Sequence, residues 1–423
     1  MIRKILHTIF TKLLSSGLGF ATIILVSQSL GPQGKGEQSL FLFNIFLIQV
    51  FAGMIGNSTL VYLRPRHGFS NLFFPSIIWI FFSLGILFIG FEFFPSIIIT
   101  HKTELFIIGL FASITEINTY ILVSKQEIKK ANDLKLIWQM VSISFLLSLW
   151  FMGDFTSSYD YVISIFFGYS LSLVYGVYLL RDEYKDLRLP SFKTLKNMFA
   201  LLFSLGAIKQ IGSIAQILNS RLSFYLISFY SGNRALGVFS NAISITEAVL
   251  MFGTSMALVQ YSKLSNTEDE AYSKSISIKM TKINLVFSLI VLAFFSLLPG
   301  EFYKFVFGEG FRDINRIIQF LSLGYLLISF TTTFTQYFAS KGNFTITTSA
   351  SILGLISTFG LGFYLVPRYG IEGGAITMTV SYLINFVVEY YYFTKWTKTR
   401  LIDFLINKED IKDIKTLIKK GFK

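Results

Sequence analysis

The residues with the clearest chemical potential lie together in one apolar stretch of the chain, residues 203–229. Polar side chains recur there at about the 3.6-residue period of one helix face, namely Lys209, Ser213, Gln216, Ser220 and Ser223. Asn219 and Arg221 lie just beside this stripe. Cationic groups suit phosphates, and amide and hydroxyl groups suit sugar hydroxyls. No acid–base pair or nucleophile constellation accompanies them, so the pattern indicates binding and not catalysis.

Two further sets of polar residues are candidates for the same site. Asn57 and Arg64 lie in or at the end of the second apolar stretch, although Arg64 equally suits an ordinary basic loop. Lys209 lies near the start of its stretch and could equally extend to the surface. Three acids, Glu116, Glu247 and Glu389, fall within apolar stretches, where they could carry protons or pair with Arg221 or Lys209. Structural pairing near an interface is the alternative for these acids.

The elements that must position these residues are membrane-spanning helices. The chain has 423 residues, of which 53% are hydrophobic and 14% charged, against about 25% charged in a soluble protein. A spanning helix needs about 20 mostly apolar residues. We expect an all-α protein with about twelve such helices, at 7–29, 38–62, 72–95, 103–124, 134–152, 159–180, 203–229, 237–261, 279–298, 316–338, 345–366 and 373–395.

The distribution of Lys and Arg predicts the orientation of these helices. Most of the 37 basic residues fall in loops on one side, which also holds both termini. Basic loops face the cytoplasm, so we expect both termini to be cytoplasmic. The net charge of +13 is therefore explained by the membrane and not by nucleic acid. The absence of Cys excludes disulfides and thiolate metal sites.

An internal repeat divides the chain into halves. Residues 31–36, which follow the first predicted helix, have the same Gly spacing as residues 232–237, which follow the seventh. This offset predicts two six-helix bundles in parallel orientation. We therefore expect an N-terminal lobe at 1–182, a basic cytoplasmic linker at 183–197, a C-terminal lobe at 198–396 and an amphipathic cytoplasmic tail at 397–423.

Four short segments resemble one known family. Residues 29–37, SLGPQGKGE, resemble the LGPEGYGEY turn of the polysaccharide-repeat-unit (O-antigen) flippases. Residues 236–240, LGVFS, are similar to their LGIYS segment, and residues 339–343, ASKGN, are similar to their ALGK turn. Residues 366–375, VPRYGIEGGA, resemble their IPKYGIIGAA turn. The four segments occur in the expected order across the whole chain.

This resemblance implies the multidrug/oligosaccharidyl-lipid/polysaccharide exporter superfamily, with two six-helix lobes around a central cavity. It further implies a flippase that moves undecaprenyl-diphosphate-linked oligosaccharides from the cytoplasmic to the outer leaflet by alternating access. The expected place is the bacterial cytoplasmic (inner) membrane, in O-antigen, capsule or exopolysaccharide assembly. A polymerase and glycosyltransferases are the expected protein partners. No cofactor is expected, and coupling to H⁺ or Na⁺ stays open.

Other functions remain as alternatives. A multidrug cation exporter of the same superfamily would need acidic cavity residues, whereas the deepest candidate here is Arg221. The peptidoglycan-lipid flippase of the superfamily usually has two more helices. A polysaccharide polymerase or ligase would need a larger external loop than residues 299–315 provide. Gly34-Lys35-Gly36 lacks the Ser or Thr of a P-loop, so an ATPase is not expected.

Overall fold

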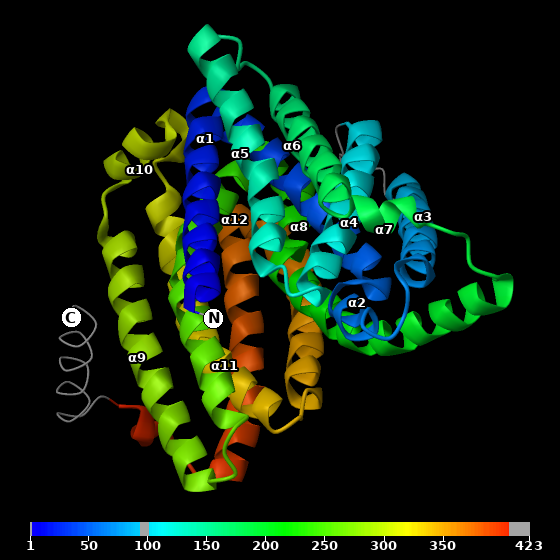
Figure 1. Ribbon diagram of the computed structural model, residues 1–423. Coiled ribbons are helices and arrows are strands. Elements are labelled where there is room, and N and C mark those ends of the chain that lie inside the picture. The colour runs from blue at the N-terminus through cyan, green and yellow to red at the C-terminus, as the bar shows by residue number, and fades with distance from the viewer. Residues whose placement is uncertain (1, 94–100, 406–423) are drawn as a thin grey trace. The chain divides into compact units, whose positions relative to one another are not determined.

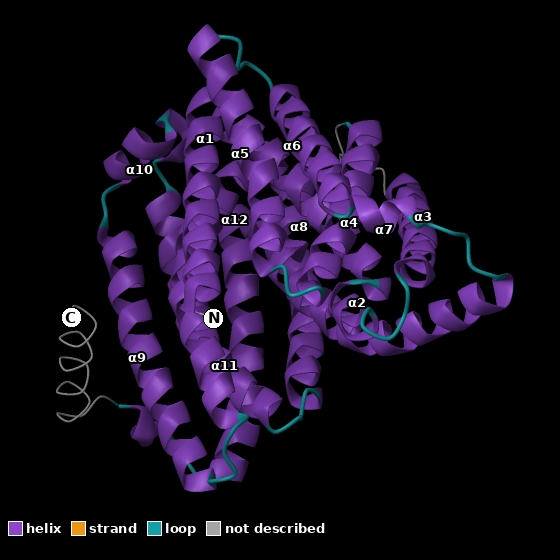
Figure 2. Cartoon of the chain, viewed as in Figure 1, coloured by secondary structure: helices purple, strands orange, loops and turns teal. Residues whose placement is uncertain are grey.

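The computed structural model describes residues 2–93 and 101–405, without the side chains of a few helical residues, Lys209 among them. The described residues form helices joined by short turns, without any strand (Figures 1 and 2). The short 3₁₀ segments are η1 (Gly53–Ile55), η2 (Glu309–Phe311) and η3 (Leu401–Phe404). The α-helices are α1 (Ile2–Ala52), α2 (Asn57–Leu63), α3 (Phe69–Phe93), α4 (Lys102–Ser124), α5 (Ile128–Met152), α6 (Ser158–Leu179), α7 (Arg181–Lys185), α8 (Phe192–Leu264), α9 (Glu270–Leu297), α10 (Gly300–Phe307), α11 (Ile314–Ser340) and α12 (Thr345–Thr397).

Three of these helices are long enough to cross a membrane twice. The described residues contain 9 apolar segments of spanning length, and three of them have 53 or 54 residues. One of the three runs from α1 through η1 to the end of α2, and the other two lie in α8 and α12. Each of the three contains a glycine with positive φ, namely Gly31 (64°), Gly232 (83°) and Gly370 (55°). Such values favour glycine, which has no Cβ to clash. Counting each long helix as two spans gives the twelve spans that the sequence predicts.

The predicted internal repeat is also a repeat in space. A Cβ on Gly36 would lie 1.8 Å from the carbonyl oxygen of Asn233, and a Cβ on Gly237 would lie 1.9 Å from that of Pro32. Positions 36 and 237 are 201 residues apart, and so are positions 32 and 233. Reciprocal contacts of this kind are what a two-fold relation produces. The two turns therefore pack backbone against backbone, and only glycine fits at either contact.

The second span is interrupted between α1 and α2, at η1. The interruption frees carbonyl groups at the end of α1, and such groups need new donors where water is excluded. Gln210 Nε2 donates to the Val50 carbonyl oxygen at 2.6 Å, and Trp79 Nε1 donates to that of Phe51 at 2.8 Å. Neighbouring helices thus satisfy the broken backbone, and they hold the break in a fixed geometry.

The chain divides into two compact units. Unit 1 comprises residues 1–214, 232–237 and 306–310, and unit 2 comprises residues 215–231, 238–305 and 311–423. The predicted N-terminal lobe (1–182) and linker (183–197) both fall in unit 1. The border between the units lies inside the seventh span, after Ile214. Two short segments, 232–237 and 306–310, group with unit 1 although the residues on either side of them in the sequence belong to unit 2. The predicted tail, 397–423, lies largely outside the described residues.

Small polar side chains hold the helices of unit 2 together. Thr281 and Thr333 are hydrogen-bonded at 2.6 Å, and Ser288 and Ser329 at 2.9 Å, between α9 and α11. Asn284 Nδ2 donates to the Ser329 carbonyl oxygen at 2.8 Å. Helices in lipid gain no hydrophobic energy from association, so close packing and hydrogen bonds of this type stabilise the bundle.

Candidate functional site

An ion pair occupies the middle of the polar stretch in α8. Arg221 Nη2 lies 2.8 Å from Glu247 Oε2, and both residues belong to unit 2. Isolated charges are costly in a membrane span, so each side chain stabilises the other. The Arg221 side chain is nevertheless 24% exposed and the Glu247 side chain 31% exposed. The pair is therefore partly exposed and not sealed in the core of unit 2.

Aromatic side chains surround this pair. The Arg221 guanidinium carbon lies 5.1 Å from the centroid of the Phe224 ring, within the range of a cation–π contact. The phenol groups of Tyr325 and Tyr382 are close enough to interact electrostatically with Arg221. Their rings meet edge to face with centroids 5.6 Å apart. An apolar frame with few polar groups strengthens the field of the guanidinium at its exposed edge.

Asn219 does not face the exposed side of α8. It is buried, and its Oδ1 accepts hydrogen bonds from Thr358 Oγ1 at 2.6 Å and from Ser381 Oγ. Thr358 and Ser381 lie on the two halves of α12, either side of its Gly370 kink. The side chain therefore joins three spans of unit 2, which is a structural role.

The residues of the stripe itself have different environments. Gln216 is exposed, and Ser220 is partly buried and donates to the Ile217 carbonyl oxygen at 3.0 Å. Ser213 is partly buried and belongs to unit 1. The side chain of Lys209 lies outside the part of the chain that the structure describes. Gln216, Ser220 and Arg221 thus remain as candidate ligand contacts within unit 2.

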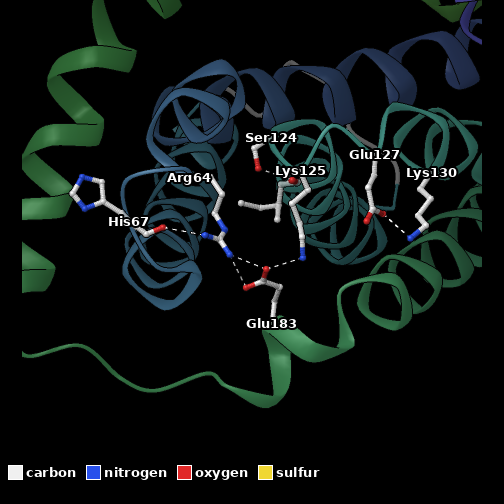
Figure 3. A network of polar contacts seen from close by, with 8 residues as sticks. Arg64, His67, Ser124, Lys125, Glu127, Lys130 and Glu183 are labelled. Carbon is white, nitrogen blue, oxygen red and sulfur yellow. Dashed lines mark hydrogen bonds and ion pairs between the residues drawn. The ribbon is translucent and has the colours of Figure 1, made fainter. Parts of the chain in front are cut away.

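Arg64 belongs to an ionic network at the ends of α2 and α4 (Figure 3). Its Nη2 lies 2.7 and 2.9 Å from the two carboxylate oxygens of Glu183 in α7. Lys125 Nζ lies 2.9 Å from the same carboxylate. Burial favours a higher pKa for Glu183, but hydrogen bonds and charges from Lys125 and Arg64 outweigh burial and lower that pKa. Arg64 therefore fastens α7 to the spans of unit 1.

The remaining candidates are separate from this network. Asn57 begins α2 with φ 52°, and its amide group packs over Gly53. Glu116 in α4 lies close enough to Lys135 to interact electrostatically. Glu389 in α12 is 5% exposed, and Thr335 Oγ1 donates to its two carboxylate oxygens at 3.1 and 3.3 Å. Among the described residues, no cation lies within ion-pair distance of Glu389, and no cluster of His, Asp or Glu suits a metal ion.

Several residues important to these contacts escape sequence analysis. Glu183 is one of two acids in the predicted linker, and only the fold shows that it bridges Arg64 and Lys125. Gln210 stands within a predicted span, and its polarity alone marks it out. Tyr325 and Tyr382 carry no signal, because aromatic residues are common throughout this chain.

The arrangement defines a class of protein, a multi-span helical membrane protein with a partly exposed ion pair in one helical unit. Residues 1–257 match the family described as polysaccharide biosynthesis protein, which is more than half of the chain. The chain belongs to this family.

Two relatives are similar to parts of the chain. A capsular polysaccharide biosynthesis protein, CapF, of Staphylococcus aureus is 24% identical over 203 residues, 47% of this chain and 50% of CapF. A probable low-salt glycan biosynthesis flippase, Agl15, of Haloferax volcanii is 20% identical over 242 residues, 56% of this chain and 50% of Agl15. The chain thus spans about half the length of these curated relatives.

Two solved structures have a similar fold. The lipid II flippase MurJ in an inward closed conformation gives a TM-score of 0.76 at 18% identity, over 95% of this chain and 89% of MurJ. An inward-facing multidrug resistance MATE transporter of the MOP superfamily gives 0.71 at 17% identity, over 91% of this chain and 96% of that one. The predictions of an all-α transporter fold and of the polysaccharide family are confirmed. The chain is a multi-pass membrane protein.

Proposed function

We propose that the protein is a flippase for lipid-linked oligosaccharides, with a polyprenyl-diphosphate oligosaccharide as the substrate. The observation that carries this proposal is the partly exposed Arg221, which lies within an apolar segment of spanning length in a chain of the polysaccharide biosynthesis family. A diphosphate would bind the guanidinium through charge-assisted hydrogen bonds. The sugar hydroxyls would contact Gln216 and Ser220, the exposed and partly buried polar groups of the same helix.

In this proposal, Glu247 is the resting partner of Arg221. An arriving diphosphate competes with the carboxylate for the guanidinium, so the cation is never left unpaired in an apolar setting. Lys209 is a second candidate for binding the diphosphate. Asn57 and Arg64, which belong to unit 1, are candidates for further contacts with the substrate. The direction, from the cytoplasmic to the outer leaflet by alternating access, is the one that the family resemblance implies.

We propose Glu389 as the first candidate for coupling to an ion gradient. It is a buried carboxyl group whose described polar partner is the hydroxyl of Thr335. Such a group binds a proton or a small monovalent cation more readily than it stays charged and bare. Glu116 is the second candidate, and Glu247 the third.

The first test is a binding measurement on the purified protein with an undecaprenyl-diphosphate-linked oligosaccharide. Charge reversal by Arg221→Glu should weaken binding by about tenfold or more, since hydrogen bonds to charged groups contribute about 1.5–3 kcal/mol. Arg368→Glu is the matched control. Arg368 is exposed, stacks on the nearby Tyr364, and is far from Arg221 in the sequence. Equal binding by all three proteins would contradict the assignment.

The same preparation separates the alternatives. Tighter binding of a cationic dye than of the diphosphate would favour the multidrug exporter. Preference for lipid II over the oligosaccharide carrier would favour a peptidoglycan-lipid flippase.

A further inference from the structure

The segment between the sixth and seventh spans carries cations that bind nothing within the described protein. Lys185, Arg188, Lys193 and Lys196 are exposed, and no ion pair with any of them is found among the described residues. Two large apolar side chains project beside them, with Leu189 76% and Phe192 81% exposed. We name these six residues the linker surface.

The linker surface stands on a fixed support. Glu183 ties α7 to Arg64 and Lys125, as Figure 3 shows. The adjacent Tyr184 donates a hydrogen bond to Asn118 Oδ1 at 2.7 Å, and its ring lies 5.2 Å from that of Phe69. The cations are therefore held at one place on unit 1.

The first turns of α8 continue this surface as an amphipathic helix. Lys193, Lys196, Asn197, Ala200 and Ser204 are exposed at the spacing of one helix face. Met198, Leu202 and Gly206 are buried on the opposite face. This apolar face packs on the protein, where a Cβ on Gly206 would lie 1.9 Å from the Met54 carbonyl oxygen, so the lysines are left on the outer face.

Three phenylalanines follow one side of this helix, and only the first of them, Phe192, is largely exposed. Phe199 and Phe203 pack edge to face on Trp79 of α3, with centroids 6.1 and 5.6 Å apart. Phe192 lies on the same side, two turns earlier, where the described protein offers no such partner. Apolar side chains flanked by unpaired cations complement the acyl chains and anionic headgroups of a bilayer.

We propose that the linker surface binds the anionic phospholipids of the bilayer, with Phe192 in the acyl region and Lys193 and Lys196 on the headgroups. The binding is independent of the transported substrate, and it anchors the start of α8 in the membrane plane. The same helix, α8, also carries Gln210, whose side chain donates to the freed Val50 carbonyl oxygen at the break in the second span.

The chain has no cysteine, so Phe192→Cys accepts a single apolar fluorophore. The labelled protein is placed in phosphatidylcholine bilayers without any polyprenyl diphosphate, and quenching by brominated phosphatidylglycerol is compared with quenching by brominated phosphatidylcholine. We expect stronger quenching by the anionic lipid. Each lysine near an anionic surface contributes about 1 kcal/mol, so Lys193→Gln with Lys196→Gln should reduce the lipid preference by roughly 30-fold at low salt.

The matched control is Lys129→Gln with Lys263→Gln, which removes two other exposed lysines that lie in predicted cytoplasmic loops. This pair should leave the lipid preference at position 192 unchanged. Equal quenching by the two lipids in the parent protein would overturn the proposal. Equal losses in both double variants would also overturn it, because they would report net charge alone.

Discussion

Exchanging the charges of Arg221 and Glu247 separates the structural role of the pair from its proposed role in binding. The two groups are 2.8 Å apart, on two spans of the same unit. The double variant Arg221→Glu/Glu247→Arg keeps an ion pair in place but moves the cation to the other span. Each single variant, Arg221→Gln or Glu247→Gln, leaves one charge without its partner.

The expected cost of each single variant follows from burial. Removing one partner of a fully buried pair costs about 3–5 kcal/mol. The side chains here are 24% and 31% exposed, so we discount this to roughly 1–3 kcal/mol. In thermal unfolding this corresponds to a decrease in Tm of a few degrees, and the charge exchange should recover most of it.

Transport should respond differently from stability. Glu247→Gln should retain translocation, because the guanidinium that binds the diphosphate is still present. Arg221→Gln should lower translocation by roughly 10- to 100-fold, the equivalent of about 1.5–3 kcal/mol of lost charge-assisted bonding. The charge exchange should restore Tm but not translocation. Full translocation by the exchanged protein would refute the assignment of the diphosphate to Arg221.

Three further predictions concern the fold. Gly36→Ala should lower the free energy of unfolding by about 1–3 kcal/mol, because the new Cβ meets the opposite backbone. Gly17→Ala, with open space around the new Cβ, should leave the free energy of unfolding unchanged. Equal melting curves for the two variants would contradict the reciprocal contact. The lowered pKa of Glu183 means that its contribution to stability is complete above the ordinary pKa of 4.5 and is lost as the pH falls below that value. The Tm difference between the parent protein and Glu183→Gln should therefore vanish in acid. A Tm difference that stays constant with pH would argue against the ion pairs. Asn219→Ala removes the acceptor that two buried hydroxyl groups share, of which Thr358 keeps a second acceptor in the Gly354 carbonyl oxygen. The change should cost about 1–3 kcal/mol, whereas Gln216→Ala at an exposed position should leave Tm unchanged.

Hydrophobicity and the glycine spacing were enough to predict the spans and the repeat. A span in lipid must satisfy its own backbone, so its length and position are visible in the sequence. The positive φ at Gly31 and Gly232 is likewise a local property of the turn. The reciprocal contact of Gly36 and Gly237 depends on packing, which the spacing alone does not specify.

The site was predicted less completely than the fold. The sequence placed Arg221 and Asn219 together beside the polar stripe of the seventh span, but burial assigns Arg221 to a partly exposed ion pair and Asn219 to buried hydrogen bonds with α12. Whether a polar side chain is exposed depends on the neighbouring helices, and their arrangement cannot be inferred from the periodicity of one segment. For the same reason Arg64 could not be assigned before its partner Glu183 was known.

The central claim is best tested by translocation in liposomes that contain the protein and an undecaprenyl-diphosphate-linked oligosaccharide. A membrane-impermeant sugar-modifying enzyme reports how much of the oligosaccharide reaches the opposite leaflet. The account predicts protein-dependent exposure that is lost with Arg221→Glu and kept with Arg368→Glu. Exposure that is no faster than in protein-free liposomes, from a preparation that is folded by its melting curve, would contradict the flippase assignment.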